Sequence, residues 1–245
     1  MPVSALLSFE GVSKSYWRGA HETVVLADVS VEVQAGEFFA VWGQRGAGKT
    51  TLALIAAGLE TPDAGRVVFG GVDLSRGRYG AHPQLRAGIG WLQRTGPHSD
   101  EFRSITDYLV VPLLGECSPR GARRRAHAML KRLGVADCAG ERWENLTDSE
   151  RTLVALAHAL VREPRLLVAD DPTANLSVLQ REEMMGMLRA AAEQEGLGVL
   201  VTVPDMPDMA HAHRVASLSD GRLTVSGRAP REANVYSLQT RRQSA

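Results

Sequence analysis

The sequence predicts an α/β fold in which a mostly parallel β-sheet forms the core, with an N-terminal antiparallel β subdomain and an inserted helical subdomain. Three observations support this prediction. Continuous apolar runs at residues 38–42, 166–169 and 198–203 are typical of strands that are buried on both faces. Alternating and β-branched residues before residue 34 favour antiparallel strands, whereas residues 98–161 have a helical composition.

The predicted N-terminal subdomain consists of short strands joined by polar turns. Residues 5–9 and 24–33 are expected to be two of its strands, and Tyr16 is expected in a polar loop between them. An aromatic ring at this place could stack on an adenine base, or it could cover the edge of the sheet. Residues 66–74 predict a hairpin around two adjacent glycines.

Residues 43–51 are the stretch around which the chain is organised. They lie between the apolar strand 38–42 and the apolar helix expected at 52–59, and they match the pattern G-x-x-x-x-G-K-[ST]. Such a loop turns its backbone N–H groups toward phosphate oxygens at the positive end of the following helix. The alternative is a Gly-rich turn that binds nothing, but the flanking strand and helix favour a P-loop NTPase core.

Individual residues of this loop have predicted roles toward a nucleotide. Lys49, one of only three lysines in the chain, would reach the β- and γ-phosphates, and the Thr50 hydroxyl would hold Mg²⁺. The residues expected to bind the nucleotide are Tyr16, Gly43, Arg45, Gly46, Ala47, Gly48, Lys49, Thr50 and Thr51.

Further candidate site residues stand at the ends of two later strands. The apolar run before Asp170 and Asp171 would deliver both carboxylates to one edge of a parallel sheet. Asp170 is expected to contact Mg²⁺ and Asp171 to face the attacking water, although acids here could merely cap the next helix. Gln93, which ends the short strand 89–93, could hold a metal-bound water. The predicted metal ligands are Thr50, Gln93 and Asp170, and the predicted catalytic residues are Asp171 and Gln93.

The helical part of the chain is predicted over about residues 94–162. Pro112 interrupts an apolar segment at 105–114, and residues 119–133 carry six basic side chains around an apolar stripe. These basic side chains could touch phosphates, but a solvated helix face is the favoured interpretation. Thr147 and Glu150 form the pattern of a capping box at the start of another helix.

The C-terminal part completes the predicted core. Residues 179–195 form an amphipathic helix whose three methionines are expected to fill the core, and strand 198–203 follows. Two closing strands are expected at 215–218 and 223–225, and residues 228–245 are expected to be loosely ordered.

Composition limits the classes of function. The 245 residues are 44% hydrophobic, and 28 basic residues balance 28 acidic ones, so no global field recruits nucleic acid. Cys117 and Cys138 form no metal-ligand spacing, which suits a reducing cytosol. No run approaches the roughly 18 apolar residues that cross a bilayer, so any membrane role is expected to come through a partner.

From about residue 7 to residue 225, the order of these motifs resembles the nucleotide-binding domain of ABC transporters. Tyr16, the loop 43–51, Gln93, the signature region from Leu146, and Asp170 occur in the family's order. The stretches 110–114 and 169–176 are similar to the lipoprotein-release, macrolide-efflux and cell-division branch. The resemblance implies one ATP-binding domain over residues 1–245 that binds ATP and Mg²⁺.

The same resemblance implies partners and a location. Such domains form head-to-tail dimers, here a homodimer or a heterodimer, in which ATP lies between one phosphate loop and the partner's signature. They drive a separate membrane permease from the cytoplasmic face of the membrane.

The sequence departs from the family pattern at the positions that matter most for turnover. Residues 146–150 read Leu-Thr-Asp-Ser-Glu where the family has Leu-Ser-Gly-Gly-Gln. Asp171 replaces the glutamate, Val203 the switch histidine and Ser177 the D-loop aspartate. These departures predict weak ATP hydrolysis, and the alternative is a nucleotide-gated module without turnover. Arg45 stands where the family usually has serine, and it could pair with Asp148 or Glu150 across the dimer interface.

Overall fold

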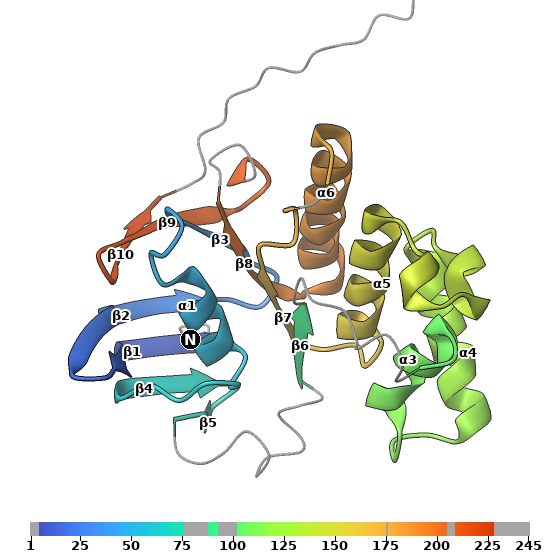
Figure 1. Cartoon of the computed structure of the whole chain (residues 1–245), viewed down its shortest axis with the longest axis horizontal. Helices are drawn as coiled ribbons and strands as arrows, with labels where there is room; N and C mark the ends of the chain where they lie inside the picture. Colours follow the sequence, from blue (N-terminus) through green and yellow to red (C-terminus); the bar gives the residue numbers. More distant parts are fainter. Residues whose placement is uncertain (1–4, 76–87, 93–101, 175, 205–208, 228–245) are drawn as a thin grey trace, which may run out of the picture.

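The computed structural model of the chain describes residues 5–75, 88–92, 102–174, 176–204 and 209–227. The strands in these residues form two sheets (Figure 1). The first is an antiparallel sheet of four strands in the order β2-β1-β4-β5. Its strands are β1 (Leu7–Arg18), β2 (His21–Val33), β4 (Ala64–Phe69) and β5 (Val72–Asp73).

The second sheet is mostly parallel and has the order β10-β9-β3-β8-β7-β6. Neighbouring strands are parallel throughout the run β9-β3-β8-β7-β6, and β10 forms an antiparallel hairpin with β9 at one edge of the sheet. Its strands are β3 (Phe38–Trp42), β6 (Ile89–Leu92), β7 (Leu166–Asp170), β8 (Gly198–Val203), β9 (Arg214–Ser219) and β10 (Arg222–Ser226).

The helices cover both faces of the parallel sheet, and α1 lies between the two sheets (Figure 1). The α-helices are α1 (Lys49–Ala56), α3 (Ile105–Val110), α4 (Pro119–Arg132), α5 (Asp148–Leu160) and α6 (Val178–Glu195). The 3₁₀ helices within the described residues are η2 (Val111–Leu113), η3 (Ala136–Gly140) and η4 (Trp143–Asn145). Pro112 lies in η2, where its missing N–H ends α3.

Alternating side chains of the central strands divide the core into two layers. Phe38 and Ala40 pack on the side of the helices α5 and α6, whereas Phe39 and Val41 pack on the side of α1 and the antiparallel sheet. Strand residues point alternately to opposite faces, so a strand that is covered on both sides is apolar throughout. The α/β fold with its parallel core and antiparallel N-terminal sheet is therefore confirmed.

The prediction of a polar loop at Tyr16 was wrong. β1 continues to Arg18, and its end pairs with the beginning of β2, so that Tyr16 lies opposite Thr23. Gly19, with a φ of 64°, allows the tight turn that brings the two strands together. The adjacent position, Trp17, points to the opposite face of the hairpin because side chains alternate along a strand.

Where they fall within the described residues, the other predicted elements have the predicted type, with ends displaced by a few residues. Met184 and Met185 are buried and Met187 is partly buried against the core, as predicted. Among the described residues, no helix is long and apolar enough to cross a membrane. Residue 94, the predicted start of the helical insertion, and the predicted tail 228–245 lie outside the described residues.

Candidate functional site

The loop between β3 and α1 is packed closely against two strands at its glycines. Gly48 precedes the first turn of α1 with a φ of 100°, in the left-handed region. A Cβ atom there would lie 2.7 Å from the carbonyl oxygen of Val25, and one at Gly43 would lie 2.6 Å from that of Leu218. Both positions therefore require glycine, because strand β2 and the end of β9 lie directly against the loop.

Lys49 is the first residue of α1, and its side chain turns back over the loop. Its Nζ donates hydrogen bonds to the carbonyl oxygens of Gly43, at 2.6 Å, and Gln44, at 3.0 Å. The ammonium is thus placed within the turn formed by residues 43–49. A phosphate that enters this turn could take the place of the carbonyl oxygens as a hydrogen-bond acceptor.

Thr50 and Asp170 are 120 residues apart in the sequence, and they meet at the carboxyl edge of the parallel sheet. Thr50 Oγ1 donates to Asp170 Oδ2 at 2.9 Å, and Thr202 Oγ1 donates to Asp170 Oδ1 at 2.6 Å. β8 lies between β3 and β7 in the sheet, so Thr202 stands beside the end of β7. The carboxylate is therefore held by one hydroxyl on each oxygen.

These oxygens fit Mg²⁺, which prefers hydroxyl and carboxylate ligands and keeps the remaining positions for water and phosphate. In the part of the chain that the structure describes, no group of three or more His, Cys, Asp or Glu residues could hold a metal ion. Of the predicted metal ligands, Thr50 and Asp170 are the two that the described residues bring together. Gln93, the third predicted ligand, lies outside the described residues.

Asp171 follows the end of β7 in an unusual backbone conformation. Its φ is 48°, and its N–H donates to the carbonyl oxygen of Thr202 at 3.0 Å and to its hydroxyl at 3.1 Å. Left-handed backbone at a residue other than glycine persists only where its surroundings hold it, and such residues are frequent at functional sites. Thr202 therefore fixes both carboxylate-bearing residues of this edge.

Thr202 was not predicted from the sequence as a site residue. The signal that could have found it is a single hydroxyl in the apolar run of β8, at a position that is fully buried. A buried polar side chain needs a hydrogen-bond partner, and the neighbouring strand end supplies the carboxylate.

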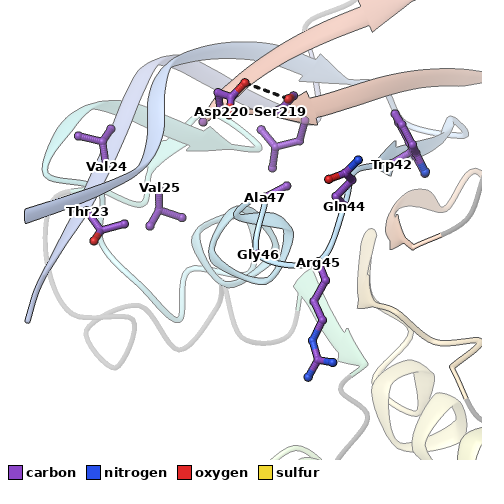
Figure 2. A pocket seen from close by; sticks show the side chains of 12 residues that line it. Thr23, Val24, Val25, Trp42, Gln44, Arg45, Gly46, Ala47, Ser219 and Asp220 are labelled. Atoms are coloured by element: carbon purple, nitrogen blue, oxygen red, sulfur yellow. Dashed lines mark hydrogen bonds between the residues drawn. The ribbon is translucent and has the colours of Figure 1, made fainter.

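A hollow of about 560 Å³ borders the phosphate loop on the side of Gln44 to Ala47 (Figure 2). The first residues of β2, from Thr23 to Val25, form another wall, and the turn after β9 forms a third. Thr23 is the cross-strand partner of Tyr16, so the hairpin that carries Tyr16 reaches this hollow. The lining residues are Thr23, Val24, Val25, Trp42, Gln44, Arg45, Gly46, Ala47, Leu218, Ser219, Asp220 and Gly221.

The signature region forms the start of α5. Thr147 is the N-cap, and its N–H and hydroxyl donate to Glu150 Oε2 at 2.8 and 2.7 Å. These bonds, the backbone one first, lower the pKa of Glu150. The N–H of Glu150 in turn donates to Thr147 Oγ1 at 3.4 Å, which completes the predicted capping box. Asp148 lies 3.5 Å from Arg151 on the same helix. Two carboxylates therefore stand in the first turn of α5.

The two histidines that follow β8 have partners outside the phosphate loop. His213 Nδ1 accepts a hydrogen bond from the N–H of Phe38, at 2.9 Å, and Phe38 is the first residue of β3. The phosphate loop follows the other end of that strand. His211 pairs with Glu182 of α6 at 2.8 Å, and Val203, which was predicted to stand in place of a switch histidine, is fully buried.

These features define a class of protein, the P-loop nucleotide-binding cassettes: a phosphate loop between a central parallel strand and a helix, with a hydroxyl and a carboxylate beside it. Residues 26–174 match the family model for the ABC transporter, so the chain belongs to the ABC transporter family.

Solved structures agree with this assignment. The ATP-binding cassette MJ0796, solved as a dimer in a post-hydrolysis state with ADP and Pi, is similar at 25% identity with a TM-score of 0.83; the match covers 90% of this chain and 98% of that one. CbiO1 from Clostridium perfringens, part of the ABC transporter complex cbiONQ, is 25% identical with a TM-score of 0.78 and coverage of 92% and 89%. A nucleotide-free cassette from an ABC transporter, 20% identical with a TM-score of 0.78, shares the fold.

Proposed function

We propose that this chain is the ATP-binding subunit of an ABC transporter, which binds Mg-ATP at a dimer interface and hydrolyses it weakly. The observation that carries the proposal is the contact of 2.9 Å between Thr50 and Asp170 beside a glycine-lined loop. Mg-ATP supplies an electrophilic γ-phosphate and a metal that neutralises its charge. Lys49 would bind the β- and γ-phosphates, Thr50 and Asp170 would hold the metal with Gln93, and Tyr16 would stack on the base.

Weak hydrolysis is supported by four side chains. Asp171 has a carboxylate one methylene shorter than the family's glutamate, and assistance by a well-placed general base contributes ~10²–10⁴-fold to a rate. The side chain of Val203 has no donor that could form a hydrogen bond with a γ-phosphate. The carboxylates of Asp148 and Glu150 would face a partner's nucleotide in a head-to-tail dimer, where the family has glycine and glutamine.

The proposed partners follow from the family. The relative MJ0796 was solved as a dimer, and cbiO1 is part of a transporter complex. For this chain we propose a dimer with a second copy or a second cassette, attached to the cytoplasmic face of the membrane through a separate permease. The similarity of residues 110–114 and 169–176 favours the lipoprotein-release, macrolide-efflux and cell-division branch.

Phosphate release by the purified chain, alone and with its copurified membrane partner, tests this proposal. Steady turnover that Lys49→Ala abolishes is the expected result. Absence of any binding of Mg-ATP in calorimetry would overturn the proposal.

The second candidate is a nucleotide-gated assembly module that does not turn over ATP. The buried Val203 and the acidic start of α5 favour it. Tight binding of Mg-ATP with no phosphate release in either condition would identify this function instead.

A further inference from the structure

Lys14 is a buried lysine that the nucleotide-binding roles above do not use. It lies on β1 two residues before Tyr16 and is only 8% exposed. Its Nζ contacts three oxygens at 2.9–3.0 Å, and a buried ammonium needs such partners. Burial lowers the pKa of Lys14, but the two carboxylates raise it by more, so the side chain stays charged. The three oxygens belong to Glu60, Thr61 and Asp63.

These three partners come from the segment that follows α1, the helix whose first residue is Lys49 of the phosphate loop. The N–H of Glu60 bonds to the carbonyl oxygen of Leu54, which ties the segment to the end of that helix. Lys14 therefore links the strand that carries Tyr16 to the helix that carries the phosphate loop.

Asp63 fixes the backbone of β1 on both sides of Lys14. Its carboxylate accepts from the N–H of Ser15 at 2.7 Å, and its own N–H donates to the carbonyl oxygen of Ser13 at 2.9 Å. The β1–β2 pairing shifts register at Lys14, and the pairing of β1 with β4 ends at Ser13. The carboxylate thus replaces a ladder hydrogen bond at the place where the strand is irregular.

The ammonium of Lys14 also lies over the ring of Tyr16, 5.3 Å from its centroid. A cation at this distance is attracted by the face of the ring. Tyr16 remains 41% exposed, so Lys14 covers only part of the tyrosine side chain and the exposed part can still contact a base. The ion-paired lysine restricts the ring at an otherwise exposed hairpin end.

From this geometry we propose that Lys14 is a positioning residue of the nucleotide site: held by Glu60 and Asp63, it orients the Tyr16 ring for stacking on the base of the bound nucleotide. The inference rests on the proposed nucleotide-binding function. It assigns to Lys14 the part of the affinity that depends on the base, and to Lys49 the part that depends on the phosphates.

Calorimetry with Mg-ATP and with Mg-tripolyphosphate, which has no base, separates the two contributions. Lys14→Met should lower the affinity for ATP about tenfold, within the range that base–aromatic stacking contributes, and leave that for tripolyphosphate within about twofold. Lys14→Arg should restore ATP affinity, because a guanidinium can pair with both carboxylates. The matched control is Lys131→Met in α4, where the lysine is exposed, and it should change neither affinity.

A double-mutant cycle tests whether Lys14 acts through the ring. In a Tyr16→Leu background, Lys14→Met should have no further effect on ATP affinity. A persisting effect would overturn the inference, because the lysine would then act on the nucleotide by another route. Trp17→Ala, which removes the aromatic ring on the opposite face of the hairpin, should leave ATP affinity unchanged.

The remaining outcomes are also decisive. If the wild-type chain binds Mg-ATP but Lys14→Met changes neither affinity, or lowers the affinities for ATP and tripolyphosphate by the same factor, only this inference fails. If the wild-type chain binds neither ligand, the proposed function fails with it. Should Lys14→Met not fold, Asp63→Asn serves instead, since its amide oxygen can still accept a hydrogen bond from the N–H of Ser15. This variant should lose less ATP affinity than Lys14→Met and keep its affinity for tripolyphosphate. An unchanged ratio of ATP affinity to tripolyphosphate affinity would overturn the inference.

Discussion

Asp170 receives a hydroxyl group on each of its carboxylate oxygens, one from the helix after the phosphate loop and one from the neighbouring strand. Hydrogen bonds to a charged acceptor are stronger than neutral ones and fix its direction. The carboxylate is therefore oriented before a metal arrives. Thr202 acts as the support that holds Asp170 in this direction.

We expect Thr202→Val to weaken binding of Mg²⁺ with ATP about tenfold and to leave metal-free ATP binding nearly unchanged. The substitution removes a hydrogen bond to a charged group, which contributes about 1.5–3 kcal/mol, without changing the side-chain volume much. Magnesium titrations of ATP binding measure the effect. Thr106→Val is the matched control, since Thr106 is a buried threonine whose hydroxyl bonds to the Ala139 carbonyl oxygen. Equal magnesium dependence in both variants would contradict the role of Thr202.

Arg45 has an exposed position on the phosphate loop and lines the hollow beside it. If it pairs with Asp148 or Glu150 of a second subunit, Arg45→Glu should weaken ATP-dependent dimerisation about tenfold, because charge reversal turns attraction into repulsion. Light scattering with Mg-ATP measures this change. Arg124→Glu, an exposed substitution in α4, should have no such effect, and unchanged dimer formation by Arg45→Glu would remove the idea.

At the scale of elements, the start of α5 combines a structural role with an electrostatic one. Glu150 closes a capping box with Thr147, so its carboxylate satisfies the N-cap N–H. The negative charge also stands at the positive end of the helix dipole, where it is stabilising. The same charge would oppose the phosphate of a partner's nucleotide. A neutral side chain with the same hydrogen-bonding reach can separate these two effects.

Glu150→Gln is the substitution that separates them. Glutamine also serves in a capping box, so the melting temperature should change little. If Arg45 of the second subunit pairs with Asp148 and leaves Glu150 unpaired, ATP-dependent dimerisation should become about two- to fivefold tighter as repulsion is removed. Thr147→Ala is the complementary variant, which removes the cap and should cost about 1 kcal/mol of stability. A loss of dimerisation in Glu150→Gln would show that the carboxylate itself is needed at the interface.

At the scale of the whole molecule, an aromatic cluster joins the helices that cover the parallel sheet. The rings of Tyr108 in α3 and His158 in α5 stack with centroids 4.1 Å apart at an angle of 7°, and Trp143 meets Tyr108 edge-on at 5.9 Å. Burial lowers the pKa of His158 to about 4 and raises that of Tyr108 to about 12. Both side chains are therefore uncharged in the folded protein at neutral pH, as an apolar contact between helices requires.

This burial predicts a loss of stability in acid. The unfolded chain binds a proton at His158 near its ordinary pKa of about 6.5, whereas the folded chain resists protonation until about pH 4. The free energy of unfolding should therefore be unaffected by this group above pH 6.5 and should fall by about 3 kcal/mol as the pH drops to 4. Denaturant unfolding across this window measures the change.

His158→Phe should remove this part of the pH dependence, since phenylalanine keeps the stack and does not titrate. His127→Phe, at an exposed histidine of α4, is the matched control and should keep the wild-type profile. If the free energy of unfolding depends on pH in the same way for wild type and His158→Phe, the assignment to His158 is contradicted.

Local sequence determined the phosphate loop, the apolar strands and the capping box, because each depends on residues close together in the chain. The spacing of Gly43, Gly48 and Lys49 between a strand and a helix was sufficient to predict a nucleotide site. The extent of β1 was missed, because the end of the Tyr16 hairpin looks polar in sequence and is ordered by pairing with residues 21–24.

Only the tertiary structure decided which distant residues meet. Asp170 and Thr202 are joined by the order of strands in the parallel sheet, and Lys14 and Asp63 by the packing of β1 against the segment after α1. Strand order and register fix such contacts, and neither is encoded in a short stretch of sequence. A motif can state which chemical groups a site needs, whereas the packing of the sheet determines which side chains hold those groups in place.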